Sequence, residues 1–196
     1  MKRLFDIVAS SLGLIILSPL LLIIAIWIKL DSVGPVFYRQ VRVGRNNIDF
    51  SLFKFRSMRI GSDKKRLITV GDHDPRVTNC GLFIRKYKID ELPQLINVFL
   101  GDMSIVGPRP EVRKYVDMYS PEQMHVLDVR PGITDLASIK YRNESELLSS
   151  ASDPDKYYVD VVMQDKLRIN LEYVHSRSFG LDIKIIVKTL LAIVCK

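Results

Sequence analysis

The stretch from Ile7 to Ile28 reads IVASSLGLIILSPLLLIIAIWI, which is 22 residues without a charged side chain. At about 1.5 Å per residue, a straight helix of this length covers a hydrocarbon core of about 30 Å. The stretch is too long for a cleaved signal peptide, and Lys29-Leu30-Asp31 follows it rather than small residues. We therefore expect residues 1–30 to form a retained membrane element and residues 31–196 to form one folded domain.

Two features bear on how this segment sits in a membrane. Ser18-Pro19 falls at its middle, where a proline favours a helix kink. Lys2 and Arg3 precede the segment and Lys29 follows it, so the positive-inside rule places both ends on the cytoplasmic face. A re-entrant helix that bends and leaves on one side satisfies both features. A proline-kinked span is the alternative, and these residues alone do not separate the two.

The composition limits the architecture and the class of partner. A chain of 196 residues with 47% hydrophobic content can bury one core, and a net charge of +7 favours anionic partners. Nucleic acid, acidic lipid headgroups and phosphorylated small molecules all fit that charge. The two cysteines, Cys80 and Cys195, lack CxxC spacing, which indicates a reduced compartment, no structural zinc and a packing role for both.

A basic block follows the membrane segment. Residues 39–66 hold nine cations against two acids, Asp49 and Asp63. The cations are Arg39, Arg42, Arg45, Lys54, Arg56, Arg59, Lys64, Lys65 and Arg66. Within the block, Ile48–Phe55 alternates as a strand does, which predicts Lys54 and Arg56 on one face, presenting two cations to a phosphate.

An acid pair precedes an amphipathic pattern. Apolar residues recur at helical spacing at Leu92, Leu95, Ile96, Phe99 and Leu100. Pro93 is tolerated because it falls in the first turn, so Asp90 and Glu91 are expected at the N-terminus of this helix. That position stabilises carboxylates or bound phosphate. The alternative is that Asp90 is an N-cap without chemistry.

Other signals complete a fold that we expect to be α+β, predominantly helical with a small sheet. Helix caps are predicted at Ser120-Pro121-Glu122-Gln123, Asn143-Glu144-Ser145-Glu146 and Asp153-Pro154. Rigid turns with exposed polar groups are predicted at Gly101-Asp102-Met103-Ser104, Gly107-Pro108-Arg109-Pro110 and Arg130-Pro131-Gly132-Ile133-Thr134. Leu181–Cys195 carries Lys184 and Lys188 at i,i+4 spacing, which is typical of an interfacial helix; a buried terminal helix is the alternative.

Several familiar sites are absent from the sequence. It contains no GxGxxG, Walker loop, HExxH or GxSxG motif. His73, His125 and His175 are scattered without ligand spacing, so we interpret them as surface or packing residues.

The motifs in their order resemble the bacterial sugar transferase family, the small monotopic phosphoglycosyl transferases. The resemblance covers nearly the whole chain. It rests on Ser18-Pro19, Gly34-Pro35-Val36-Phe37, Lys54-Phe55-Arg56-Ser57-Met58, Asp74-Pro75-Arg76-Val77-Thr78, Asp90-Glu91-Leu92-Pro93-Gln94-Leu95, Gly101-Asp102-Met103-Ser104, Gly107-Pro108-Arg109-Pro110 and Arg130-Pro131-Gly132-Ile133-Thr134.

The resemblance implies a re-entrant helix broken at Ser18-Pro19 and a catalytic domain at the cytoplasmic face of the bacterial inner membrane, with membrane-associated helices. It implies that Asp90 attacks the β-phosphorus of a UDP-sugar and expels UMP, after which undecaprenyl phosphate takes the sugar phosphate. Such a reaction initiates glycan assembly. The family also requires Mg²⁺, for which Asp90 and Glu91 are the expected ligands.

Site roles follow from that resemblance and from phosphoryl-transfer chemistry, in which fixed cations stabilise spread negative charge. We assign Asp90 and Glu91 to catalysis and Lys54, Arg56, Arg85 and Arg109 to the substrate phosphates. After Thr134, the run Asp135-Leu136-Ala137-Ser138 departs from the glycine-tryptophan pair of many relatives, which puts the sugar pocket in doubt.

Two other functions compete with the transferase hypothesis. A catalytically silent membrane adaptor would use the basic face to bind acidic lipid or a partner protein. A nucleic-acid binder ranks last, because no nucleic-acid motif accompanies the charge. The expected partners are therefore a UDP-sugar, undecaprenyl phosphate and membrane lipids, without nucleic acid, and a homodimer is left open.

Overall fold

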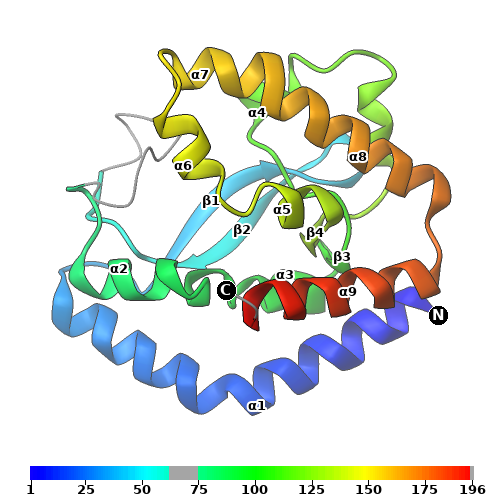
Figure 1. Cartoon of the computed structure of the whole chain (residues 1–196). Coiled ribbons are helices and arrows are strands. Elements are labelled where there is room, and N and C mark those ends of the chain that lie inside the picture. The colour runs from blue at the N-terminus through cyan, green and yellow to red at the C-terminus, as the bar shows by residue number, and fades with distance from the viewer. Residues whose placement is uncertain (62–74, 195–196) are drawn as a thin grey trace.

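The structure is a computed structural model that describes residues 1–61 and 75–194. Part of the basic block, His73, Asp74 and Cys195 lie outside these residues. Helix α1, Lys2–Asp31, is continuous, contains Pro19, and is long and apolar enough to cross a membrane. Its two ends lie against the rest of the chain, and the bend between them points away (Figure 1). Pro19 accounts for the bend, because proline removes a helix hydrogen bond.

Four short strands form two small sheets rather than one. β1, Phe37–Val43, pairs antiparallel with β2, Asp49–Phe55, in a register from Phe37 opposite Phe55 to Val43 opposite Asp49. The predicted strand is thus confirmed, beginning one residue later than expected. β3, Ser104–Val106, pairs in parallel with β4, Gly132–Thr134, which places two of the predicted rigid turns side by side.

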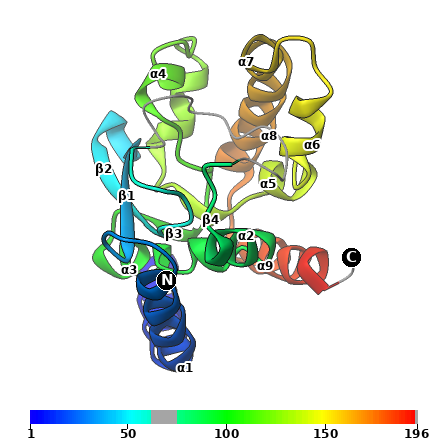
Figure 2. The same cartoon turned by 90° about the vertical axis from the view of Figure 1, so that its left-hand side faces the viewer.

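Helices form layers on either side of the sheets (Figures 1 and 2). The layer next to α1 contains α2, Asn79–Lys86, α3, Gln94–Leu100, and α9, Phe179–Val194. The opposite layer contains α4, Arg113–Val116, η4, Gln123–Asp128, α5, Leu136–Lys140, α6, Glu144–Ser149, α7, Pro154–Tyr157, and α8, Met163–Ser176, with the π turn Tyr158–Val162 joining α7 to α8. The expected predominantly helical α+β fold is confirmed.

Two of the predicted helix caps are formed as expected. The Asp153 carboxylate accepts a hydrogen bond of 3.1 Å from the backbone N–H of Lys156 and so caps α7. Ser120 and Gln123 exchange reciprocal hydrogen bonds between side chain and backbone, in the manner of a capping box. Asn143 precedes α6 but makes no side-chain cap.

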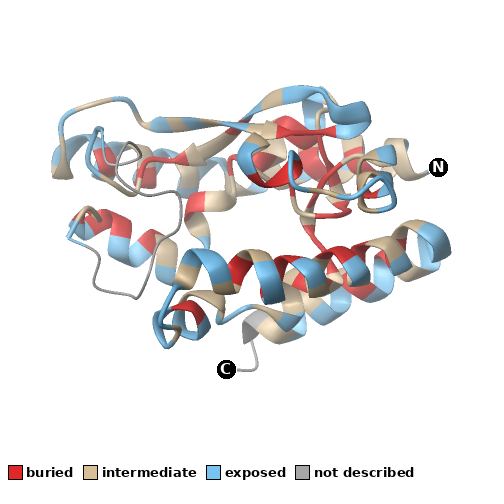
Figure 3. Cartoon of the chain, turned by 90° about the horizontal axis from the view of Figure 1, so that it is seen from above, coloured by how far each residue is buried: buried red, intermediate tan, exposed pale blue. Residues whose placement is uncertain are grey.

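Apolar side chains stay exposed on the layer that contains α1. Figure 3 shows the buried residues concentrated between the elements and the exposed residues along their outer faces. On α1 the exposed apolar residues include Leu12, Ile15, Ile16, Leu20, Leu22 and Ile23. α9 has features of both the interfacial and the buried helix that the sequence allowed. Ile185 is fully buried, while Ile183, Val187 and Leu190 are exposed. α1 and α9 thus present apolar surface that a lipid phase would cover.

The N-terminal end of α1 is attached by polar contacts. Lys2 donates from Nζ to the backbone carbonyl of Val106 at 2.8 Å and to the Asp182 carboxylate at 2.7 Å. The buried Asp6 carboxylate accepts from the Ser104 hydroxyl at 3.0 Å. These contacts join the start of α1 to β3 and to α9.

The C-terminal end of α1 is attached by Arg56. This buried guanidinium donates to the backbone carbonyls of Ser32 at 2.7 Å, Ile28 at 3.3 Å, and Val33. The expected placement of Arg56 beside Lys54 on one strand face is therefore wrong. β2 ends at Phe55, so the alternation stops there, and the carbonyls of Ser32 and Val33, just past the end of α1, accept from the guanidinium instead.

Cys80 is packed as predicted. It is fully buried at the start of α2, and its backbone N–H donates to the Asp31 carboxylate at 3.0 Å. Burial raises the pKa of the Cys80 thiol to about 11, with the negative charge of Asp31 adding to the effect. The thiol is therefore a neutral core group at physiological pH.

Candidate active site

The acid pair lies in its own turn rather than in the predicted helix. Ile89–Glu91 forms a 3₁₀ turn, and α3 begins only at Gln94, after Pro93. Lys88 opens the turn in the left-handed region, with φ of 57°. With about three residues per turn, consecutive side chains in a 3₁₀ turn leave the backbone in different directions. Asp90 and Glu91 are thus free to have different surroundings although they are adjacent.

Glu91 is fixed by two cations from distant parts of the chain. Lys54, on β2, donates to Glu91 Oε1 at 3.0 Å. Arg109, in the loop after β3, donates from Nη1 to Glu91 Oε2 at 3.1 Å and from Nη2 to Oε1. Burial alone would raise the pKa of Glu91, but the charges and hydrogen bonds of Arg109 and Lys54 hold it well below its usual range. Glu91 is therefore an ionised group with both oxygens occupied.

Asp90 is buried with an oxygen left over. Its residue is 8% exposed, and its Oδ1 has no hydrogen-bond partner among the residues that the structure describes. Burial raises the pKa of Asp90, and the negative charge of Glu91 adds to this, while Lys54, Arg85 and Lys88 act in the opposite direction. An unpaired oxygen on a buried carboxylate is costly for stability, which marks Asp90 as a candidate for chemistry.

The parallel pairing of β3 and β4 brings Arg109 to this place. Gly107 donates its backbone N–H to the carbonyl of Thr134 at 3.1 Å, and Gly132 donates to the carbonyl of Pro108 at 3.0 Å. A Cβ atom at either glycine would collide with the backbone of the opposite turn. Glycine at both positions therefore allows the close approach that sets the start of the Arg109 loop.

A second ion pair supports the same loop. Arg42, on β1, donates to the carbonyl of Pro110 at 2.9 Å, and its Nη1 lies 3.5 Å from Glu111 Oε2. Burial lowers the pKa of Arg42, while Glu111 counteracts this. The sequence analysis counted Arg42 within the basic block but assigned it no role, and the alternation of β1 was the signal that could have placed it near Arg109.

The site residues assigned from the sequence divide into two groups. The structure brings Lys54, Arg109, Asp90 and Glu91 together, with the charge of Arg85 acting on Asp90, whereas Arg56 is used at the end of α1. In the divergent run after Thr134, Asp135 caps α5 by accepting from the backbone N–H of Ser138 at 2.8 Å. The roles of the grouped residues stay predictions.

The acid pair fits a metal ion only in part. In residues 1–61 and 75–194 no three His, Cys, Asp or Glu side chains gather as a ligand set. Mg²⁺ commonly uses one or two carboxylates together with substrate phosphates, so a complete protein cage is not required. Asp90 Oδ1 is available for such a contact, while both Glu91 oxygens already accept from cations.

Comparisons with known proteins agree with the resemblance seen in the sequence. The chain belongs to the bacterial sugar transferase family, whose model matches residues 1–196. It is 41% identical over 192 residues to the UDP-N-acetylgalactosamine-undecaprenyl-phosphate N-acetylgalactosaminephosphotransferase of Aeromonas hydrophila. The matched region covers 96% of this chain and 42% of that protein. The UDP-glucose:undecaprenyl-phosphate glucose-1-phosphate transferase of Klebsiella pneumoniae is also 41% identical over 192 residues, with 96% and 39% covered.

A shorter relative matches over most of its length. The exopolysaccharide production protein ExoY of Rhizobium meliloti is 35% identical over 207 residues, covering 98% of this chain and 84% of that protein. The chain thus spans about two fifths of the length of the first two relatives and most of the third.

Proposed function

We propose that this chain transfers a sugar 1-phosphate from a UDP-sugar to undecaprenyl phosphate and releases UMP. The observation that carries the proposal is the buried Asp90 carboxylate beside the cation-bound Glu91, because its Oδ1 has no partner among the residues that the structure describes. The names of the relatives supply the two substrates, since both glycosyl phosphotransferases named above act on undecaprenyl phosphate.

The reaction would proceed in two displacements through a covalent aspartyl phosphosugar. An Asp90 oxygen forms a bond to the β-phosphorus of the UDP-sugar, and the bond from that phosphorus to the bridging oxygen breaks, so the electron pair leaves with UMP. A phosphate oxygen of the lipid then attacks the same phosphorus and the bond to Asp90 breaks. The carboxylate is regenerated, and the product is an undecaprenyl diphosphate sugar.

The other residues of the site would prepare this attack. Glu91 acts as a positioning residue, because it holds Lys54 and Arg109 at the side of the acid pair. Those two cations, with Arg85, would offset the negative charge of the diphosphate, which otherwise repels a carboxylate nucleophile. Asp90, whose Oδ1 is available, would hold Mg²⁺ together with the substrate phosphates, and the ion would supply further charge neutralisation.

The attachment of α1 supports a re-entrant placement in the membrane. Both ends of α1 bind the same folded body, the start through Lys2 and Asp6 and the end through Arg56. A helix with both ends fixed to one body on one side of a bilayer must return to that side. Both ends of α1 and the active site would then lie on one side of the membrane, with the bend at Pro19 inside the lipid, and the positive-inside rule makes that side the cytoplasmic face. External thiol reagents should then label neither Lys2→Cys nor Lys29→Cys in intact cells, and labelling of either would restore the spanning helix.

The assay of the proposed reaction is UMP release by purified protein with a panel of UDP-sugars, undecaprenyl phosphate and Mg²⁺. Asp90→Asn should release no UMP and should trap no labelled sugar phosphate on the protein. Asp117→Asn is the matched control, because its side chain is 62% exposed on the opposite layer. UMP release by Asp90→Asn at the parental rate would refute the nucleophile assignment.

The adaptor hypothesis makes a separate prediction. A silent adaptor would bind liposomes regardless of substitution at Asp90 and would turn over no UDP-sugar. Absence of UMP release across the whole panel, with intact liposome binding, would favour it over the transferase.

A further inference from the structure

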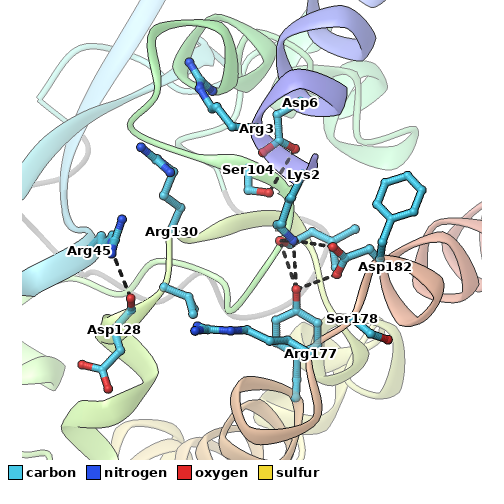
Figure 4. Close-up of a pocket in the computed structure, with 14 residues that line it drawn as sticks. Lys2, Arg3, Asp6, Arg45, Ser104, Asp128, Arg130, Arg177, Ser178 and Asp182 are labelled. Atoms are coloured by element: carbon cyan, nitrogen blue, oxygen red, sulfur yellow. Dashed lines mark hydrogen bonds and ion pairs between the residues drawn. The ribbon is translucent and has the colours of Figure 1, made fainter.

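A cavity of about 430 Å³ lies at the N-terminal end of α1, away from the acid pair (Figure 4). Its volume is within the range of about 300–1,000 Å³ that is usual for small-molecule sites. None of its lining residues belongs to the group around Asp90. The acid pair lies just before the start of α3, whereas Arg3, which lines the cavity, binds the carbonyls of Val98 and Phe99 at the last turn of α3. The length of α3, about 10 Å, therefore separates the two sites.

The charge of this cavity favours an anion. Five basic and three acidic side chains line it. Each acid is already engaged: Asp6 accepts from Ser104, Asp128 contacts His125 at 2.9 Å, and Asp182 binds Lys2. Lys2 and Asp182 form a neutral pair, which leaves four arginines against Asp6 and Asp128, so the cavity keeps a net positive charge of two.

Three of those arginines come from three different segments. Arg45 begins the turn between β1 and β2, Arg130 precedes β4, and Arg177 follows α8, and all three border the same space in Figure 4. Arg45 and Arg130 donate to the protein from Nε, to the carbonyls of Asp128 at 3.2 Å and Gly101 at 2.8 Å.

The terminal nitrogens of these guanidinium groups remain available. Among the described residues, Arg177 makes no hydrogen bond or ion pair, and the Nη atoms of Arg45 and Arg130 have no acceptor. A guanidinium fork matches two oxygens of a phosphate group, so arginines that border a cavity suit a phosphate ester well.

The mouth of the cavity adjoins apolar surface. Phe179, which lines it, is 45% exposed and packs edge-on against Phe5 at 5.5 Å between ring centroids. Leu4, on the neighbouring turn of α1, is 68% exposed. A phosphate in the cavity would thus lie beside the surface that a lipid phase covers.

We propose that this cavity is a second anion site, which takes a phosphate ester group among the basic side chains that border it, Arg45, Arg130 and Arg177. The group belongs either to an anionic phospholipid headgroup or to a soluble phosphate ester. The site is independent of the transfer reaction and would anchor the N-terminal end of α1 at headgroup level.

The test uses the double variant Arg45→Gln/Arg177→Gln of the full chain, in which Arg130 keeps its structural bond to Gly101. Flotation with vesicles of phosphatidylcholine, alone or mixed with phosphatidylglycerol, measures lipid binding. Thermal unfolding with glycerol 3-phosphate measures binding of the soluble ester. Lys114→Gln/Arg168→Gln is the matched control, since it removes the same charge from α4 and α8.

The affinity of the double variant for vesicles with phosphatidylglycerol should fall by about fivefold for each charge removed, or about thirtyfold in all. The affinity of the control variant should fall much less. Loss on vesicles identifies a lipid headgroup as the ligand, and loss of stabilisation by glycerol 3-phosphate alone identifies a soluble ester. Equal losses in the variant and the control, or no loss in either assay, would overturn the proposal. If the double variant does not fold, Arg177→Gln alone decides the question, because Arg177 has no described partner whose loss would disturb the fold.

Discussion

Replacing Asp90 by asparagine should stabilise the protein while it abolishes UMP release. The parent keeps a carboxylate 8% exposed with Oδ1 unpartnered, and burial followed by the charge of Glu91 raises its pKa. A carboxyl group with a raised pKa contributes stability that is fully present below its unfolded pKa and is lost as pH rises through the folded pKa. At neutral pH the folded parent therefore carries the cost of a buried charge that asparagine removes.

The size of the gain follows from the unpaired oxygen. A buried polar group without a partner costs about 1–3 kcal/mol, and more when charged, while asparagine keeps a polar group there. We expect a net gain of about 1–2 kcal/mol at pH 7. For a chain of 196 residues this corresponds to a rise in Tm of about 2–8 °C.

Thermal unfolding in detergent at a fixed scan rate, at about pH 7 and again at about pH 4, checks both magnitude and sign. The difference in Tm should shrink at the lower pH, because the raised pKa of the parental Asp90 lets more of that carboxylate take up a proton there. Asp165→Asn is the control of opposite sign, because hydrogen bonds from Lys140, Arg168 and Tyr141 lower the pKa of Asp165, so its replacement should destabilise. A fall in Tm for Asp90→Asn at pH 7, or a gain that does not change with pH, would refute the reasoning.

Three further predictions concern the surroundings of the site. Glu91→Gln should lower kcat and shift the acid limb of the pH–rate profile to lower pH, because removing the charge of Glu91 lowers the pKa of Asp90. An acid limb at the parental pH would contradict this prediction. Arg56→Ala should destabilise by about 2–4 kcal/mol in chemical denaturation without changing the KM for the UDP-sugar, since the carbonyls of Ser32 and Val33 lose their donor, and a raised KM with unchanged stability would return Arg56 to the active site. Gly132→Ala should lower both Tm and kcat, because its Cβ meets the backbone of Gly107 and displaces the Arg109 loop; parental values of both would show that the loop tolerates the change.

Local patterns predicted those parts of the protein that depend on neighbouring residues. The alternation of residues 48–55 gave β2, and the Asp153 cap gave the start of α7, because both signals act within a few residues. The helix after the acid pair was placed too early. The apolar spacing of this helix begins at Leu92, but the chain forms a separate 3₁₀ turn before Pro93, and the helix begins after it.

Contacts between distant residues account for what the sequence did not show. The bonds from Lys54 and Arg109 to Glu91 join β2, the 3₁₀ turn Ile89–Glu91 and the loop after β3, and no spacing rule predicts such a contact. Arg56 illustrates the opposite failure, because strand periodicity was extended one residue beyond the strand. The cavity of Arg45, Arg130 and Arg177 was likewise invisible, since its three arginines come from separate segments.

The attachment of α1 sets an order for co-translational assembly. Its C-terminal end binds Arg56 and Cys80, which leave the ribosome soon after the helix. Lys2, at the other end, must wait for Asp182, and at about 5–20 residues per second that takes on the order of ten seconds or more. During that interval Arg3 and Asp6 can already bind Val98 and Ser104, but the contact between Lys2 and α9 is still missing. The start of α1 is therefore attached in two stages, first to α3 and β3 and later to α9.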